Sequence, residues 1–172
     1  LMTAYLAFKY GNMDDIVTVS DSVSSFASDE VVCNLQPGDT VTLYDLLCGL
    51  LLRSGNDCGV AIAEYISGSV DAFAELMNTE AKALGATGSH FVNPHGLHND
   101  NHYTTAYDLY LIFNACIQDQ RFIDIISMDS YTMNLTGADG TARTFDVVPT
   151  NYYSAGKVTA PDGIRVFGGK TG

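Results

Sequence analysis

Two short polar segments carry the side chains most suited to chemistry. Ser54-Gly55-Asn56 lies between two apolar stretches, and Lys170-Thr171-Gly172 ends the chain in a glycine-rich segment. Hydroxyl, amide and ammonium groups can bind substrates, and some of them can move protons. Each tripeptide alone is a weak signal, because Ser54 is more simply a helix cap and Lys170 the end of a surface strand. The two together, in this order and with mostly helical sequence between them, are more specific.

Helices must position the first of these segments. Apolar periodicity and capping residues predict helices at 1–10, about 42–52, about 57–66, 70–84 and 105 to about 116. The expected caps are Thr42, Ser69 and Thr105, and an aspartate follows Thr42 and Thr105 three residues later, at Asp45 and Asp108. The Ser54 segment therefore falls between two buried helices.

Strands are expected to carry the second segment. From about residue 125 the pattern alternates, which predicts a hairpin of 131–135 with 141–148 around the turn at 136–140. A last strand is expected to begin at 164 and to carry Lys170 to the end of the chain. Residues 16–32 are expected to form only short extended pieces.

Composition restricts the class of protein. Of the 172 residues, 47% are hydrophobic and 16% are charged, which favours a packed core over disorder. The net charge is −12, and the eight Lys and Arg residues are scattered, so we expect no nucleic-acid partner and no attraction to anionic lipid. No apolar run reaches the roughly 20 residues of a membrane-spanning helix, so membrane association is expected only through segments outside this chain.

The sequence resembles one family over most of its length. Penicillin-binding proteins and class A β-lactamases carry S-x-x-K, S-D-N and K-T-G in this order, and the two tripeptides above match the second and third motifs. Five further segments are similar to serine-type D-alanyl-D-alanine carboxypeptidases, the low-molecular-mass penicillin-binding proteins, which typically have glycine in the middle of the second motif: 35–39, 51–57, 72–78, 90–97 and 103–109. Residues 136–162 are less familiar.

The resemblance implies a fold and a domain. We expect an α+β fold of the serine β-lactamase/transpeptidase type, with an antiparallel sheet flanked by helices, a helical lobe, and the site in the cleft between them. Residues 1–172 are expected to form a single, incomplete catalytic domain, with the helical lobe at about 12–128 and sheet segments at about 129–172.

The resemblance also implies roles for five residues in an acyl transfer. Ser54 is expected to pass a proton toward the leaving D-alanine, and Asn56 to hydrogen-bond the substrate backbone and help to place the base. Lys170 would keep the site electropositive, the Thr171 hydroxyl would bind the substrate carboxylate, and Gly172 would let backbones approach closely. The implied substrates are peptidoglycan stem peptides ending in D-Ala-D-Ala, and the implied inhibitors are β-lactam antibiotics.

The first motif is expected to lie outside this chain. Leu1-Met2-Thr3-Ala4 looks like the sequence that directly follows the S-x-x-K lysine in this family. The nucleophilic serine, the general-base lysine and the two N–H groups of the oxyanion hole are therefore expected in segments before Leu1 and after Gly172. The 172 residues alone are expected to be inactive, and the protein is expected outside the cytoplasmic membrane, in the cell envelope.

Two other functions stay open. The first is a class A-like β-lactamase, which needs a glutamate to activate the deacylating water. Glycine at position 55 argues against it, and Glu75 and Glu80 are both expected on a solvated helix face. The second is a non-catalytic peptidoglycan-binding relative, against which the intact Ser54 and Lys170 argue.

Neither a cofactor nor a metal is expected. His95, His98, Asp100 and His102 lie within eight residues, and the spacing of His98 and His102 would suit a metal, but a polar loop is the favoured interpretation. The four cysteines lack C-x-x-C spacing, and Cys48 and Cys116 are expected as buried thiols.

Overall fold

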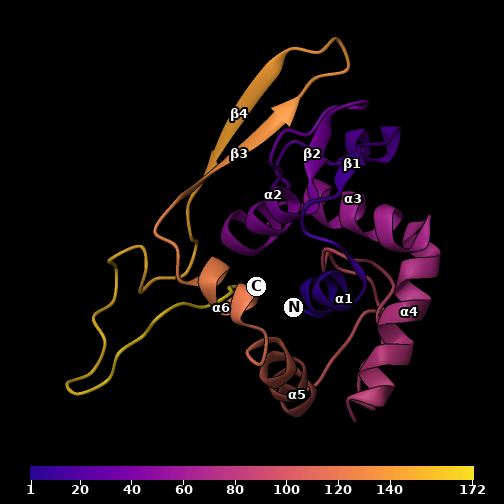
Figure 1. Cartoon of the computed structure of the whole chain (residues 1–172). Helices are drawn as coiled ribbons and strands as arrows, with labels where there is room; N and C mark the ends of the chain where they lie inside the picture. The colour runs from indigo at the N-terminus through magenta and orange to yellow at the C-terminus, as the bar shows by residue number, and fades with distance from the viewer.

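The computed structural model describes residues 1–172 and contains six α-helices and one four-stranded sheet (Figure 1). The helices are α1 (Met2–Tyr10), α2 (Leu43–Cys48), α3 (Asn56–Ser67), α4 (Val70–Ala83), α5 (Ala106–Cys116) and α6 (Gln120–Ile126). Helix α2 runs directly into a π-helical turn, η2 (Gly49–Arg53), and a short 3₁₀ helix, η1 (Asp21–Ser25), follows the first strand. None of the helices has the length and apolar character that crossing a membrane requires.

The predicted helix starts are confirmed. The side chains of Thr42, Ser69 and Thr105 accept hydrogen bonds from backbone N–H groups in the first turns of α2, α4 and α5. These bonds satisfy donors that the helix itself leaves unpaired. Helix α6 was not predicted. Its seven residues are too few for a clear period, and Asp119 caps it.

The helices share one hydrophobic core of 36 buried residues. Helix α2 and η2 are buried almost throughout, which explains the uninterrupted apolar run from Leu46 to Leu52. A helix that is apolar on all sides must be surrounded by protein. Ser54 therefore directly follows a buried helical segment, and the buried part of α3 begins two residues after it.

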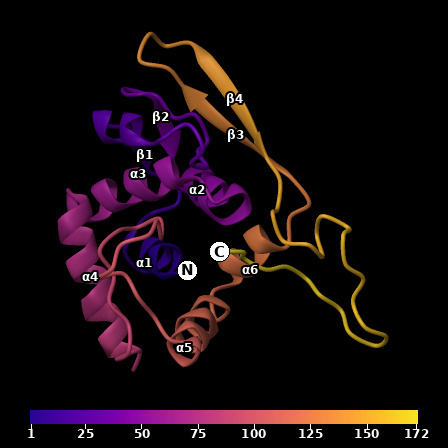
Figure 2. The same ribbon diagram turned by 180° about the vertical axis from the view of Figure 1, so that it is seen from behind.

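The sheet is antiparallel, with the strand order β1-β2-β3-β4. Its strands are β1 (Ile16–Thr18), β2 (Thr40–Thr42), β3 (Tyr131–Thr136) and β4 (Ala142–Val147). The predicted hairpin is confirmed, and its β3 alternates, with Met133 and Leu135 buried and their neighbours exposed. Both views show this hairpin projecting beyond the helices (Figure 1 and Figure 2).

The predicted strand from 164 to the end of the chain is wrong. These residues form no strand, and the only backbone hydrogen bond near them joins Ile164 N–H to the Pro161 carbonyl. A strand needs a neighbouring strand to receive its N–H and C=O groups, and this segment instead packs Gly168 against the backbone of Ile126 at the end of α6. The chain thus returns from an outlying excursion to end beside α6 and near the N-terminus (Figure 2).

Candidate active site

A strained turn presents Ser54. The residue has φ 69° and ψ 35°, the left-handed region, and follows the π-helical turn η2. A non-glycine residue in this conformation costs about 1–2 kcal/mol, and both left-handed residues and π-turns concentrate at functional sites. Gly55, not Ser54, is the N-cap of α3, and it makes no side-chain cap. Ser54 is instead the C-cap of η2, so the helix-cap interpretation holds for its backbone, and its hydroxyl is left for another partner.

That partner is Lys170. Its Nζ donates a hydrogen bond of 2.6 Å to Ser54 Oγ across 116 positions of sequence, and it also donates to the Thr171 carbonyl. Burial lowers the pKa of Lys170. An ammonium can only donate, so Ser54 Oγ is the acceptor and its own O–H must point elsewhere. The pair has the polarity needed to deliver the Ser54 proton to a third group.

All five predicted site residues line one cavity. A hollow of about 630 Å³ is lined by Ser54, Asn56, Lys170, Thr171 and Gly172. A neighbouring hollow of about 410 Å³ shares four of these five residues and continues to Leu1, Met2 and Thr3 at the start of α1. The two hollows form one cleft between the helices and the terminal segment. The structure therefore brings all five residues together.

Asn56 and its neighbour are fixed by the backbone around them. Asn56 begins α3, and its N–H donates to the Val31 carbonyl over 2.9 Å. The buried Asp57 carboxylate accepts hydrogen bonds from the N–H groups of Cys33, Leu35 and Cys58. This carboxylate holds the loop before β2 against the start of α3. The sequence places Asp57 in the first turn of a helix, but nothing in the sequence indicates that it holds this loop.

The loop from His90 to Leu97 forms a second wall of the cleft. The Asn78 side chain both donates to and accepts from the backbone of Phe91, each over 2.8 Å. Thr3 Oγ1 donates to the Pro94 carbonyl over 2.5 Å, which joins this loop to α1. An irregular segment held by this many bonds can keep a site in shape without regular secondary structure.

Thr150 was not predicted as a site residue. Its Oγ1 lies 2.5 Å from Thr171 Oγ1, and it lines the 630 Å³ hollow. The hydroxyl pair fixes the side chain that would bind a substrate carboxylate. The sequence around Thr150 belongs to the unfamiliar stretch and gave no signal for this role.

The histidines do not form a metal centre. His98 and Asp100 pair at 3.4 Å on the surface, while His95 and His102 line the 410 Å³ hollow. Burial lowers the pKa of both His95 and His102, which favours their neutral forms. The three side chains that do gather with metal-like spacing are Cys33, Asp57 and Cys58, in the core.

The expectation for the two glutamates is half right. Glu75 is exposed, but Glu80 is buried and accepts hydrogen bonds from Lys9 Nζ and Tyr10 Oη. Glu80 lies three and seven positions after Met77 and Phe73, so it shares their core face. It lines neither hollow of the cleft, which leaves it no part in activating a water there.

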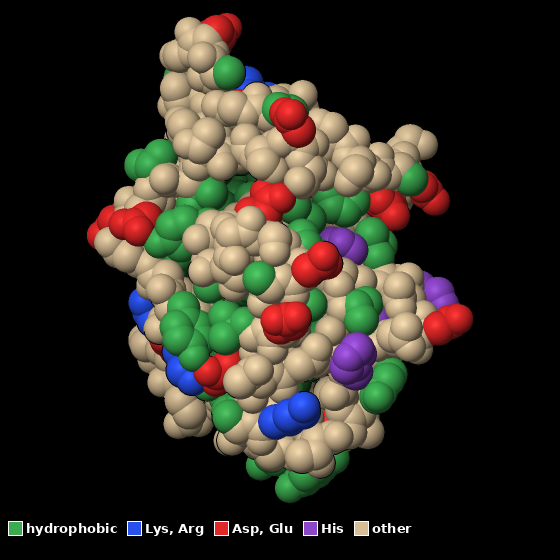
Figure 3. Space-filling model, turned by 90° about the vertical axis from the view of Figure 1, so that its right-hand side faces the viewer, with side chains coloured by type: hydrophobic (Ala, Val, Ile, Leu, Met, Phe, Trp, Pro, Cys, Tyr) green, Lys and Arg blue, Asp and Glu red, His purple; other side chains and the backbone are tan.

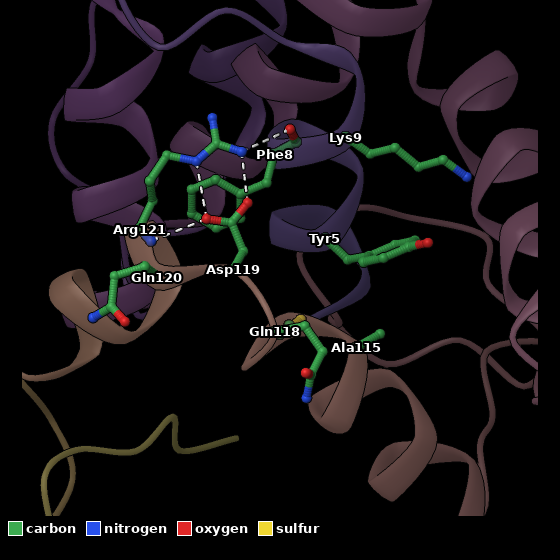
Figure 4. Close-up of a pocket in the computed structure, with 9 residues that line it drawn as sticks. Tyr5, Phe8, Lys9, Ala115, Gln118, Asp119, Gln120 and Arg121 are labelled. Atoms are coloured by element: carbon green, nitrogen blue, oxygen red, sulfur yellow. Dashed lines mark hydrogen bonds and ion pairs between the residues drawn. The ribbon is translucent and has the colours of Figure 1, made fainter.

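A third hollow of about 510 Å³ lies away from the cleft, against α1 and the turn between α5 and α6 (Figure 4). Its charged groups are already paired, since Arg121 donates to both Asp119 oxygens and to the Phe8 carbonyl. None of the predicted site residues lines it. Acidic side chains are spread over the face shown in Figure 3 and Lys and Arg are few there, which agrees with the net charge of −12.

Comparisons with known proteins identify the family. The family model described as D-alanyl-D-alanine carboxypeptidase matches residues 1–172. The chain is 41% identical over 97 residues to D-alanyl-D-alanine carboxypeptidase DacF of Bacillus subtilis, covering 56% of this chain and 24% of the relative. It is 38% identical over 128 residues to DacA of Escherichia coli K12, covering 69% of this chain and 32% of the relative. The chain thus spans about a quarter to a third of the length of these curated relatives.

Solved structures agree with the expected fold. A mutant of the Streptomyces K15 DD-transpeptidase superposes with a TM-score of 0.87 at 30% identity, covering 99% of this chain and 68% of the other. A second mutant of the same enzyme gives 0.83 over 90% of this chain and 64% of the other. The predicted transpeptidase-type fold is therefore confirmed. With a family model that matches its whole length, the chain belongs to the D-alanyl-D-alanine carboxypeptidase family.

Proposed function

We propose that the protein of which this chain forms the site region is a serine-type D-Ala-D-Ala carboxypeptidase. It removes the terminal D-alanine from peptidoglycan stem pentapeptides through an acyl-enzyme, and penicillin inhibits it. The observation that carries the proposal is the 2.6 Å contact from Lys170 Nζ to Ser54 Oγ, in a cleft also lined by Asn56, Thr171 and Gly172.

The reaction begins with a serine that the family resemblance places before Leu1. Its Oγ attacks the carbonyl of the penultimate D-alanine, and its proton passes to a lysine in the same segment. Leu1 and Thr3 line the cleft beside Ser54, so the segment joined to Leu1 would enter the cleft at this point. Two backbone N–H groups outside the 172 residues would hold the oxyanion.

Ser54 and Lys170 act when the C–N bond breaks. The leaving D-alanine nitrogen needs a proton, and the Ser54 hydroxyl, free to point away from Lys170, supplies it. The positive charge of Lys170 favours loss of that proton and attracts the substrate carboxylate, which the Thr171 hydroxyl binds. Asn56 holds the substrate backbone, and Gly172 lets it approach. Water then hydrolyses the acyl-enzyme and releases the shortened peptide.

The setting follows from the substrate. We propose that residues 1–172 belong to one catalytic domain, and that it works in the cell envelope outside the cytoplasmic membrane. Its partners are then stem peptides and β-lactams, with any membrane attachment made by other segments.

The test is the intact mass of the whole protein with and without benzylpenicillin. One penicilloyl group per molecule, lost slowly, is the expected result. Lys170→Ala should gain this group much more slowly, and Lys157→Ala, the matched control for loss of a lysine, should gain it at the wild-type rate. No adduct on folded protein would contradict the proposal and favour a binding protein. An adduct lost within seconds, with hydrolysed penicillin accumulating, would favour the β-lactamase alternative. Neither Glu75 nor Glu80 lines the cleft, and the glutamate that does is Glu30.

A further inference from the structure

Two of the four cysteines lie side by side behind the Ser54 turn. The Sγ atoms of Cys33 and Cys58 and a carboxylate oxygen of Asp57 lie within 4.8 Å of one another, all three residues buried. Cys48 and Cys116 are also buried, but each lies in a different place, Cys48 beside Tyr44 and Cys116 with its thiol toward the Leu1 carbonyl over 3.7 Å. Only the first pair is placed for a reaction between sulfurs.

The group is not built as a metal site. The Asp57 oxygens are already occupied by the backbone N–H groups of Cys33, Leu35 and Cys58, at 2.9 to 3.0 Å. With the carboxylate engaged, two sulfurs remain, whereas a structural zinc needs four ligands. The carboxylate instead holds the Cys33 backbone against the start of α3, and so keeps the two thiols together.

Both sulfurs press on the glycines of the Ser54 turn. A methyl group at Gly55 would lie 2.7 Å from Cys33 Sγ and 3.2 Å from Cys58 Sγ. One at Gly49, the first residue of η2, would lie 2.6 Å from Cys58 Sγ and 3.0 Å from Cys33 Sγ. The pair thus lies directly under the residues that present Ser54, together with Asp57 Oδ1 at Gly55 and Met133 Sδ at Gly49.

From this placement we propose that Cys33 and Cys58 form a disulfide that clamps the Ser54 turn. The bond would tie the irregular segment before β2 to α3 and close a ring of chain that contains α2, η2 and Ser54-Gly55-Asn56. The sulfurs must move from within 4.8 Å to the roughly 2.05 Å of a disulfide.

The chemistry is thiol–disulfide exchange with a disulfide-bearing oxidant, protein or small molecule. One cysteine thiolate attacks the oxidant's disulfide, forming a mixed disulfide and releasing one thiol. The second cysteine thiolate attacks the mixed disulfide at the first cysteine's sulfur and releases the other thiol. Two cysteine thiols are oxidised and one disulfide is reduced to two thiols, so electrons and protons balance.

The reaction belongs to folding or to local opening. Burial raises the pKa of Cys58 well above its usual value, so the folded protein holds a thiol there and not the reactive thiolate. The segment of residues 24–32 is largely exposed and contains no helix or strand after η1, so local opening of this segment would expose Cys33. The clamp forms independently of the proposed enzymatic activity.

The test is disulfide mapping of the whole protein after refolding in reduced and oxidised glutathione. Refolding starts from unfolded protein, in which the buried thiols are accessible to glutathione. Thiols that remain free are then blocked with N-ethylmaleimide before digestion. The expected result is a crosslinked Cys33–Cys58 peptide in the oxidised sample, with Cys48 and Cys116 recovered as N-ethylmaleimide adducts. Recovery of Cys33 and Cys58 as adducts too, or crosslinks to Cys48 or Cys116 in equal amount, would overturn the proposal. The mapping needs no variant, so folding of a mutant cannot limit it.

A second measurement tests the clamp itself. The oxidised protein is expected to melt roughly 5–10 °C above the reduced protein, as a disulfide closing a ring of this size should produce. Cys33→Ala should abolish the difference between the two states, while Cys48→Ala, an equally buried control, should keep it. A mapped disulfide without any rise in Tm would overturn the clamp.

Discussion

The Ser54 turn and the Lys170 segment meet at one hydrogen bond, but they are held by opposite means. The turn lies between α2–η2 and α3, has a buried carboxylate and two thiols beneath it, and belongs to the main core. The Lys170 segment is irregular and mostly exposed, and it reaches the cleft through contacts with Ser54, Thr150 and the end of α6. Changes in the first region should therefore affect stability as well as chemistry, and changes in the second should affect chemistry alone.

Among the variants considered, Lys170→Ala is expected to have the largest effect on chemistry with almost no effect on stability. Losing the charge that faces Ser54 should slow acylation of the whole protein by benzylpenicillin on the order of 10³-fold, as removal of a preorganised donor does. Tm should move by no more than about 2 °C, because the segment contributes little to the core. Stopped-flow acylation and thermal melting measure the two effects. Lys157→Ala, in the same exposed stretch, should leave both unchanged, and a loss below tenfold for Lys170→Ala would contradict the assigned role.

Glycine-to-alanine changes compare the packing of the two regions directly. Gly55→Ala should lower the free energy of unfolding by about 1–3 kcal/mol, because its new methyl would overlap the Cys33 sulfur at 2.7 Å. Gly169→Ala is the matched control in the Lys170 segment, since the nearest atom to its methyl is 3.9 Å away, on Asn151. Urea denaturation gives both values. Equal losses at the two positions would show that the regions are packed alike.

Backbone strain at Ser54 should be measurable as the difference in stability between a glycine and an alanine at this position. Ser54→Gly is expected to be more stable than Ser54→Ala by about 1 kcal/mol, because only glycine adopts φ 69° without cost. Both variants lose the hydroxyl and its bond to Lys170, so their difference isolates the backbone. Should the two variants unfold at the same urea concentration, the left-handed conformation of Ser54 would not be strained.

The smallest expected effect is a shift in the pH dependence of acylation by penicillin. Burial lowers the pKa of Lys170 from its ordinary 10.5, so its charge is lost at a lower pH than that of a free lysine. The alkaline limb of penicillin acylation should therefore fall below pH 10.5 in the wild-type protein. Lys170→Arg, which stays protonated, should move that limb to higher pH even if the rate is lower. An identical limb in both proteins would assign it to another group.

The sequence predicted the first region better than the second, for a physical reason. Helices around the Ser54 turn are encoded by local features, such as the Thr42 cap and the run from Leu46 to Leu52. The terminal strand was wrong because a strand depends on a neighbour that no local pattern can supply. The family resemblance predicted the pair Ser54 and Lys170. The contacts of Asp57, of Thr150 and of the Cys33–Cys58 pair could not be predicted, because the fold brings them together from separate segments of the chain.

The π-helical turn before Ser54 makes the length of this stretch as important as its composition. A π-turn carries one residue more than the α-helical turn it replaces, and each residue advances an α-helix by about 100°. Deleting one residue between Gly49 and Arg53 would allow η2 to continue α2 as a regular helix, since the leucines that remain are apolar and well suited to it. The same deletion would rotate Ser54 out of the cleft. In this family member, single-residue insertions and deletions there should be less tolerated than most substitutions.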